Sequence, residues 1–159
     1  PVVFTRAANV YGAGQQLYRV IPRAFLSALC HSDFRLDGDG SSVRSFIHIK
    51  DVVKATYMLA TDAKPGTSWH ISCKDFISIK SLVKKIFELA DSDFNKYVTT
   101  GPDRLGKDES YLLDSSKIRD CFDWSDLISL DEGLLEVKRW CIDNIEILKT
   151  LPWTYSHSK

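Results

Sequence analysis

The chain has 159 residues, and its 21 lysine and arginine side chains balance 21 aspartate and glutamate side chains, so its formal net charge is zero. The hydrophobic fraction of 44% and the charged fraction of 26% are ordinary for a globular protein. A neutral chain does not bind nucleic acid through bulk attraction to phosphate. No apolar run approaches the roughly 20 residues that cross a bilayer. We therefore expect neither a nucleic-acid partner nor a membrane anchor.

The first third of the chain predicts a strand, a loop and a helix. The apolar, β-branched run Val2–Thr5 predicts a buried strand, and the glycines in Asn9–Gly14 predict a loop. Apolar residues at helical spacing from Leu17 to Leu29 predict a helix that begins close to Pro22. A buried parallel strand needs neighbours on both sides. The sequence therefore raises the question of which strands flank the first one.

The middle of the chain predicts three further strands and two helices. The strands are expected at Phe34–Leu36, Ser45–Ile49 and Ser68–Ser72. Asp51 is a candidate N-cap for the helix that follows the second of these strands. Ser78 is a candidate N-cap for an amphipathic helix, because apolar residues recur behind it at helical spacing.

The last third predicts mainly helices. A short extended run at Tyr97–Thr100 precedes a polar loop at Pro102–Lys107. A short helix is expected at Ser115–Phe122 and one long helix at Leu130–Leu148, followed by a frayed tail at 152–159. Strands and helices alternate irregularly, which favours an α/β or α+β fold.

The four cysteines are widely spaced and form no Cys-x-x-Cys pair, which argues against zinc and thioredoxin-type motifs. They are Cys30, Cys73, Cys121 and Cys141. Because they are too few for a disulfide scaffold, we expect reduced thiols, a cytoplasmic protein and no metal site.

Three arginines lie in contexts that suit phosphate binding. Arg44 follows a glycine-rich turn, Arg104 shares a Gly/Pro loop with Lys107, and Arg19 lies near the start of the first helix. A guanidinium group binds phosphate oxygens in a planar fork. From composition alone, the alternative for each arginine is a solvated or salt-bridged surface position.

An asparagine, a histidine and several tryptophans admit two interpretations. Asn9 follows a strand, where ligands of α/β sheets gather, but asparagine also shapes turns. His48 lies on an alternating strand and is more simply a packed core histidine than a catalyst. Trp69, Trp124 and Trp140 are most simply core aromatics.

Two motifs resemble those of the extended short-chain dehydrogenase/reductases that act on nucleotide sugars. Arg6–Gly14 reads Arg-Ala-Ala-Asn-Val-Tyr-Gly-Ala-Gly and is similar to the family's Arg-x-x-Asn-x-Tyr-Gly-Pro-Gly, with Ala13 in place of proline. Gly38–Asp51 is similar to Gly-x-Gly-x-x-x-Arg-x-Phe-Ile-His-Val-x-Asp, with Ile49 in place of valine.

The C-terminal third resembles one subfamily, the dTDP-glucose 4,6-dehydratases. Asp103–Asp108 is similar to their Asp-Arg-Pro-Gly-His-Asp run, and Tyr111–Asp114 to their Tyr-x-Ile-Asp. Trp124 and the run Glu132–Leu134 continue the similarity, which covers nearly the whole chain.

This resemblance implies an α/β fold that is the C-terminal, substrate-binding portion of a Rossmann-type enzyme. Residues 1–14 would be a late strand and loop of a truncated dinucleotide-binding sheet. Residues 15–151 would form a small mixed α/β lobe that binds the nucleotide sugar, and 152–159 a disordered tail.

The resemblance also implies roles for individual residues. Those expected to bind the substrate, with Arg44 and Arg104 clamping its diphosphate, are Asn9, Arg19, Arg44, Arg104 and Lys107. Ala7 would lie where the chain passes the nicotinamide of the cofactor. Asp37 replaces a tyrosine near the base, His70 an asparagine and Lys107 a histidine, so the nucleotide and the sugar stay open.

The implied function is that of an NAD-dependent nucleotide-sugar 4,6-dehydratase. Such an enzyme oxidises the sugar at C4, eliminates water across C5 and C6, and returns the hydride to C6. The resemblance places the catalytic residues and most of the NAD site in a missing N-terminal Rossmann half, so no catalytic residue is expected in these 159 residues, which alone should be inactive. The full protein is expected to be a homodimer. The alternatives are a nucleotide-sugar 4-epimerase and a non-catalytic sugar-nucleotide binding module.

Overall fold

The computed structural model describes residues 1–103, 106 and 109–155. The chain forms two compact units, and three separate stretches of sequence build each of them. Unit 1 comprises residues 1–12, 42–77 and 108–133, and unit 2 comprises residues 13–41, 78–107 and 134–159. The expected division of the chain at residue 14 stays a prediction.

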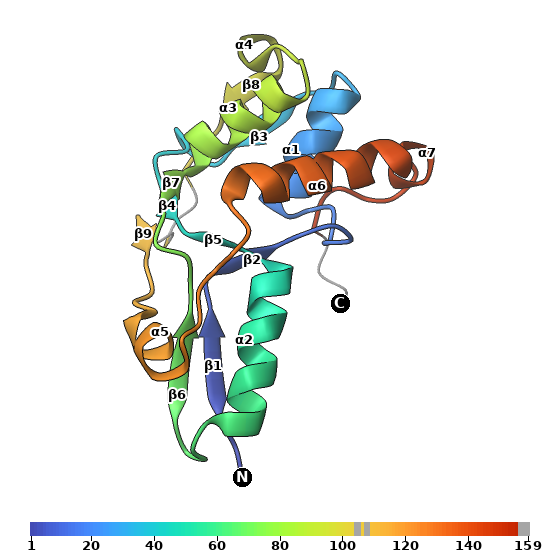
Figure 1. The fold of residues 1–159 in the computed structure, drawn as a ribbon. Coiled ribbons are helices and arrows are strands. Elements are labelled where there is room, and N and C mark those ends of the chain that lie inside the picture. The colour runs from blue at the N-terminus through green and yellow to red at the C-terminus, as the bar shows by residue number, and fades with distance from the viewer. Residues whose placement is uncertain (104–105, 107–108, 156–159) are drawn as a thin grey trace, which may run out of the picture. The chain divides into compact units, whose positions relative to one another are not determined.

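A pair of parallel strands runs through unit 1 (Figure 1). Strand β1 (Phe4–Ala7) pairs with β6 (Ser68–Ile71), in a register that places Phe4 opposite Ser68 and Ala7 opposite Ile71. Helix α2 (Ile49–Asp62) lies along β1, and helix α5 (Ser116–Phe122) lies beside β6.

The core of unit 1 forms where these two helices meet the strands. Its buried side chains are Ala8, Ile47, Ala55, Leu59, Trp69, Ile71, Ile118 and Trp124. The ring of Trp69 packs edge-on against Phe122, with centroids 5.1 Å apart. The prediction that Trp69 and Trp124 are core aromatics is therefore confirmed, whereas Trp140 is only partly buried.

Unit 1 also contains short strands that the sequence did not reveal. Strand β2 (Asn9–Tyr11) pairs in parallel with β5 (Phe46–His48), so the prediction of a loop from residue 9 is wrong. Strand β4 (Val43–Arg44) lies between β7 (Ile77–Ser78) and β9 (Ser110–Tyr111). Strands of two or three residues are too short to show a hydrophobic periodicity, and the strands with which they pair are distant in the sequence.

The predicted start of helix α2 is also wrong. The helix begins at Ile49, directly after β5, and His48 is its N-cap through Nδ1, which accepts a hydrogen bond from the Lys50 N–H at 3.4 Å. Asp51 lies inside the first turn and is buried, at 3% exposure. Its carboxylate binds a distant segment instead of capping the helix.

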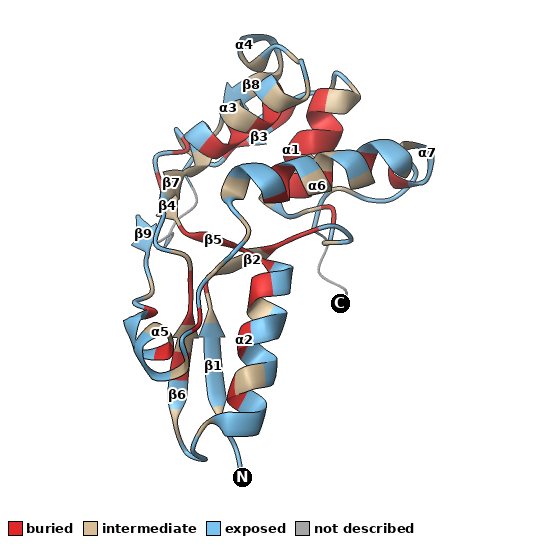
Figure 2. Cartoon of the chain, in the orientation of Figure 1, coloured by how far each residue is buried: buried red, intermediate tan, exposed pale blue. Residues whose placement is uncertain are grey.

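Unit 2 is built around two helices, α1 (Val20–Leu29) and α3 (Ile79–Leu89). Strand β3 (Phe34–Leu36) pairs in parallel with β8 (Val98–Thr100), and the short helix α4 (Phe94–Tyr97) precedes β8. Figure 2 shows the buried faces of α1 and α3 in red. The largest fully buried side chains of this unit are Ile21, Phe25, Leu26, Phe34, Leu36, Leu82, Ile86 and Phe87.

The helix ends of unit 2 partly follow the sequence. The prediction that Ser78 caps α3 is confirmed, because its Oγ accepts a hydrogen bond from the Ser81 N–H at 3.1 Å. The predicted long helix at the C-terminus is instead α6 (Leu130–Asp143) and α7 (Ile145–Leu148). Asn144 lies between the two helices, and its backbone N–H and its side-chain amide both donate to the Trp140 carbonyl, at 3.2 and 2.8 Å.

Two further observations concern the described residues as a set. None of their helices combines the length and apolar character that crossing a bilayer requires. Beyond α7, the Trp153 indole donates to the Leu148 carbonyl at 2.9 Å, and the Tyr155 ring packs edge-on against Tyr18. Residues 156–159 lie outside the described part of the chain.

Candidate functional site

The predicted site residues are divided between the two units. Ala7, Asn9 and Arg44 belong to unit 1, and Arg19 belongs to unit 2. Arg104 and Lys107 lie outside the described residues. Within unit 1, Asn9 and Arg44 lie near one another, because Asn9 binds the carbonyl of Ser45, the residue after Arg44.

Asn9 is the first residue of β2 and joins it to the segment that enters β5. Its backbone N–H and its side-chain Nδ2 both donate to the Ser45 carbonyl, each at 3.1 Å. The amide thus fixes the position of the strand pair, and Ser45 directly follows Arg44 in the chain. Among the described residues, the Asn9 Oδ1 accepts no hydrogen bond, so this atom is available to a ligand.

Arg44 bridges two short strands of unit 1. Its Nη1 donates to the carbonyls of Val43 at 2.8 Å and Glu109 at 3.3 Å. Glu109 is the residue that directly follows the run Asp103–Asp108 in the sequence. A half-buried guanidinium held by backbone carbonyls keeps its charge in a defined place, which suits an anionic ligand.

Arg19 and Ala7 have surroundings of different kinds. Arg19 is the extended N-cap residue of α1, and its guanidinium carbon lies 5.4 Å from the centroid of the Tyr18 ring. The first turn of α1 contains no acidic side chain, so no carboxylate there would repel an anion near Arg19. Ala7, at the end of β1, packs against the core of unit 1.

Two buried rings support the strand that carries Asn9. Tyr11 is 2% exposed and His48 is 1% exposed, and their rings meet edge-on with centroids 5.4 Å apart. The interpretation of His48 as a packed core histidine is therefore confirmed. The sequence reasoning gave Tyr11 no role, although its place two residues after Asn9 on a strand puts both on one face.

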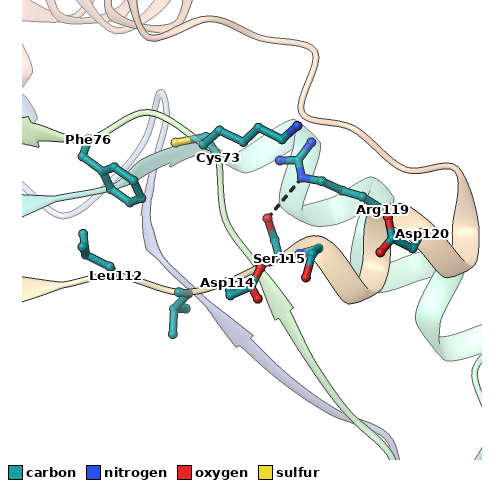
Figure 3. Close-up of a pocket in the computed structure, with 10 residues that line it drawn as sticks. Cys73, Phe76, Leu112, Asp114, Ser115, Arg119 and Asp120 are labelled. Carbon is teal, nitrogen blue, oxygen red and sulfur yellow. Dashed lines mark hydrogen bonds between the residues drawn. The ribbon is translucent and has the colours of Figure 1, made fainter.

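A separate cavity of about 550 Å³ opens elsewhere in unit 1 (Figure 3). It lies between the loop that follows β6, with Cys73 and Phe76, and the segment that leads into α5, with Leu112 and Asp114. No predicted site residue lines it. Sequence reasoning had no signal for this cavity, because its two walls, at Cys73–Phe76 and Leu112–Asp120, are far apart in the chain and share no motif.

Two polar side chains of this cavity, Ser115 and Arg119, are hydrogen-bonded within the fold. Arg119 donates from Nε to the Ser115 Oγ at 3.2 Å and from Nη2 to the Ser72 carbonyl at 2.9 Å, and it forms an ion pair with Asp126. Hydrogen bonds from Ser116 lower the pKa of Asp114. These contacts fasten α5 to β6 and provide no acid/base pair.

No metal centre is found in the part of the chain that the structure describes, since no three histidine, cysteine or carboxylate side chains gather there. All four cysteines are free thiols. Burial raises the pKa of Cys141 to about 12, so it stays protonated at neutral pH. Among the described site candidates, Arg19 and Arg44 offer positive charge and Asn9 offers a side-chain amide.

Known proteins are similar to this chain in sequence. Residues 1–72 match the model of the NAD dependent epimerase/dehydratase family. The chain is 31% identical, over 154 residues, to a dTDP-glucose 4,6-dehydratase of Haemophilus influenzae, an alignment that covers 91% of the chain and 46% of that protein.

Solved structures show the same fold. A dTDP-glucose 4,6-dehydratase from Streptomyces venezuelae with NAD bound is 27% identical, with a TM-score of 0.88 over 92% of this chain and 45% of that one. A UDP-glucose 4-epimerase from Thermotoga maritima with UDP-glucose is 27% identical, with a TM-score of 0.83 over 90% of this chain and 46% of that one. The chain thus spans about half the length of the relatives it matches.

Proposed function

Because residues 1–72 match the NAD dependent epimerase/dehydratase family, we propose that the chain belongs to this family and forms the substrate-binding part of an NAD-dependent nucleotide-sugar 4,6-dehydratase. The observation that carries this proposal is the 31% identity to a dTDP-glucose 4,6-dehydratase over 91% of the chain. That similarity extends well beyond residues 1–72, the part that matches the broader family.

In this proposal, the substrate is a nucleotide-diphosphate sugar. Arg44 and Arg104 bind the diphosphate, with Arg19 and Lys107 adding positive charge and Asn9 presenting its Oδ1 to the ligand. Arginine suits this role because its planar donors match pairs of phosphate oxygens. Such local charge is compatible with a chain whose net charge is zero.

The two edges of the β1–β6 pair support the proposal that a Rossmann half outside these residues completes the protein. The outer edge of β6 is covered, because Lys117 donates to the Ser68 carbonyl at 2.8 Å and Ser115 to the Ser72 carbonyl at 2.8 Å. Among the described residues, β1 pairs with no strand except β6.

Strand β1 is also poorly covered on its faces. Phe4 is 57% exposed, Thr5 and Arg6 are exposed as well, and Figure 2 draws most of the strand in pale blue, so the prediction of a buried strand is wrong for the described residues. Parallel strands occur in sheets that are covered on both faces, and a two-stranded sheet is marginally stable alone. These features fit a strand at the junction with a larger parallel sheet.

The cofactor would be held mainly by that other half. NAD, when bound, supplies the acceptor for the hydride that leaves C4 of the sugar. Ala7, at the carboxyl end of β1, is the one described residue that we assign to the cofactor side, because ligands of α/β folds gather at the carboxyl ends of strands. The residues of this chain bind and orient the nucleotide diphosphate, which places the sugar for reaction.

The test uses the full-length protein, the isolated 159-residue chain and a set of nucleotide-diphosphate sugars. We expect the full-length protein to form a 4-keto-6-deoxy sugar, detected by NMR, and the isolated chain to form none. Replacing Arg44 or Arg104 by alanine should raise the KM of the full-length enzyme by at least roughly 30-fold, since a truncated charge partner costs about 2–5 kcal/mol. Turnover by the isolated chain, or an unchanged KM in both variants, would contradict the proposal.

A 4-epimerase is the second candidate, and the structural similarity to the Thermotoga maritima epimerase supports it. Recovery of the C4 epimer with its 6-hydroxyl intact would establish that reaction instead. Binding of a nucleotide sugar by the full-length protein without any conversion would favour a non-catalytic binding module. The homodimer and the cytoplasmic location also stay part of the proposal.

A further inference from the structure

A glycine occupies the first turn of helix α6, where alanine would favour the helix by about 1 kcal/mol. The reason lies in its contact with Tyr11. A Cβ atom on Gly133 would lie 2.8 Å from Cζ and 2.9 Å from Cε2 of the Tyr11 ring, and closer still to the hydroxyl oxygen. Real Cβ atoms do not approach other heavy atoms so closely, so any side chain at 133 must displace the tyrosine.

Tyr11 has little room to move away. Its ring is 2% exposed and packs edge-on against His48, and its hydroxyl donates to the Leu130 carbonyl at 3.5 Å. The next residue, Gly12, is equally confined, because a Cβ there would lie 2.5 Å from Cγ2 of Ile49. Close-packed interiors transmit such a displacement to their neighbours.

The neighbour that would move is Asn9. The side chains of Asn9 and Tyr11 lie on the same face of β2, because they are two residues apart. The strand pairs with β5 in a register that places Asn9 opposite Phe46 and Tyr11 opposite His48. The two hydrogen bonds from Asn9 to the Ser45 carbonyl depend on this register. A shift of the Tyr11 ring therefore changes where the Asn9 amide points.

We propose that Gly133 is a positioning residue for nucleotide-sugar binding: by presenting no side chain, it seats Tyr11, and Tyr11 holds the Asn9 amide toward the substrate. The inference rests on the proposed function, because it takes Asn9 as a substrate contact. It goes beyond that function by assigning a role to a residue 124 positions from Asn9 in the sequence.

The test compares Gly133→Ala, Tyr11→Phe and the double variant in the full-length protein, with Arg139→Ala, at an exposed position of α6, as the control. Gly133→Ala should raise the KM for the nucleotide sugar by roughly tenfold while kcat changes little, since small misplacements of binding groups are costly. The double variant lacks the Tyr11 hydroxyl, which is the atom nearest the new methyl group, and should recover part of the increase in KM, because the ring carbons Cζ and Cε2 still lie close.

A second measurement needs no substrate. The side-chain amide resonance of Asn9 should shift in Gly133→Ala and return toward its wild-type position in the double variant, while Arg139→Ala leaves it unchanged. Failure of the wild-type protein to bind any nucleotide sugar would refute the proposed function but not this displacement. An unchanged resonance, or a KM that the double variant does not restore, would overturn the positioning role.

If Gly133→Ala does not fold, Tyr11→Ala provides another way to release Asn9. We expect the same increase in KM and the same shift of the Asn9 resonance, because the ring that supports β2 is gone. A Tyr11→Ala protein with wild-type KM and an unmoved resonance would also overturn the inference.

Discussion

Asp51 carries a carboxylate into the interior of unit 1, where it is 3% exposed. Its two oxygens accept hydrogen bonds from the backbone N–H groups of Leu127 and Ile128, each at 3.1 Å. A buried carboxylate is tolerated when it is fully hydrogen-bonded. Asp51 thereby ties helix α2 to the segment that leads into α6, on which Gly133 lies.

We expect Asp51→Asn to lower the free energy of unfolding by about 1–3 kcal/mol. The NH₂ group of the asparagine would face one of the two backbone N–H groups, of Leu127 or Ile128, and leave it without an acceptor. Equilibrium denaturation in urea measures this change. Asp62→Asn, at an exposed position of the same helix, is the control and should leave stability within about 0.5 kcal/mol of wild type. Equal effects of the two substitutions would show that the Asp51 contacts do not stabilise the fold.

At the scale of an element, the start of helix α6 contains a reciprocal capping box. The Ser129 N–H and Oγ donate to the Glu132 Oε2 at 3.0 and 2.6 Å, and the Glu132 N–H donates to the Ser129 Oγ at 3.3 Å. These bonds from Ser129 lower the pKa of Glu132, because they favour its charged form. The cap thus fixes the start of the helix one turn before the glycine that faces Tyr11.

Replacing Ser129 by alanine should raise the pKa of Glu132 toward its ordinary value, which an NMR titration of the carboxyl carbon measures. A lowered pKa adds stability that is fully present above the range in which an ordinary glutamate titrates and is lost as pH falls through the lowered value. The stability difference between wild type and variant should therefore shrink in acid. Asp114 is the control, because hydrogen bonds from Ser116 lower its pKa and this substitution leaves them in place.

At the scale of the whole molecule, the open edge of β1 predicts a pattern of amide protection. The N–H groups of Phe4 and Ala8 donate to the carbonyls of Thr67 and Ile71, both at 2.9 Å, on the β6 side. Alternate residues of a strand face opposite edges, so the N–H groups of Thr5 and Ala7 point away from β6.

In the full-length protein, we expect the Thr5 and Ala7 amides to exchange about 100-fold more slowly than in an unstructured peptide, because a further parallel strand accepts their hydrogen bonds. Residue-resolved hydrogen exchange by NMR tests this, and the Phe4 and Ala8 amides serve as internal controls that β6 protects. Unprotected Thr5 and Ala7 beside protected controls would show that no strand covers this edge.

Sequence reasoning identified candidate site residues but not the contacts that these residues make. The motifs around Asn9 and Arg44 pointed to a nucleotide sugar, and spacing found helix α3 with its Ser78 cap. Sequence could not show that Asn9 and Arg44 bind the Ser45 and Glu109 carbonyls, because such bonds depend on strand register. Arg104 and Lys107 lie outside the described residues and stay predictions.

The sequence by itself determined the resemblance to a family, through motif residues in a fixed order. It also determined the longer helices, because helical periodicity and capping are local signals within a few residues. Only the tertiary structure decided that β2 is a strand, that Asp51 binds residues 127 and 128, and that Gly133 lies against Tyr11. The contacts of Asp51 and Gly133 join segments that are 76 or more residues apart in the chain, and the pairing of β2 with β5 joins segments that are closer. Their energies come from packing and register, which neighbouring residues in the sequence do not encode.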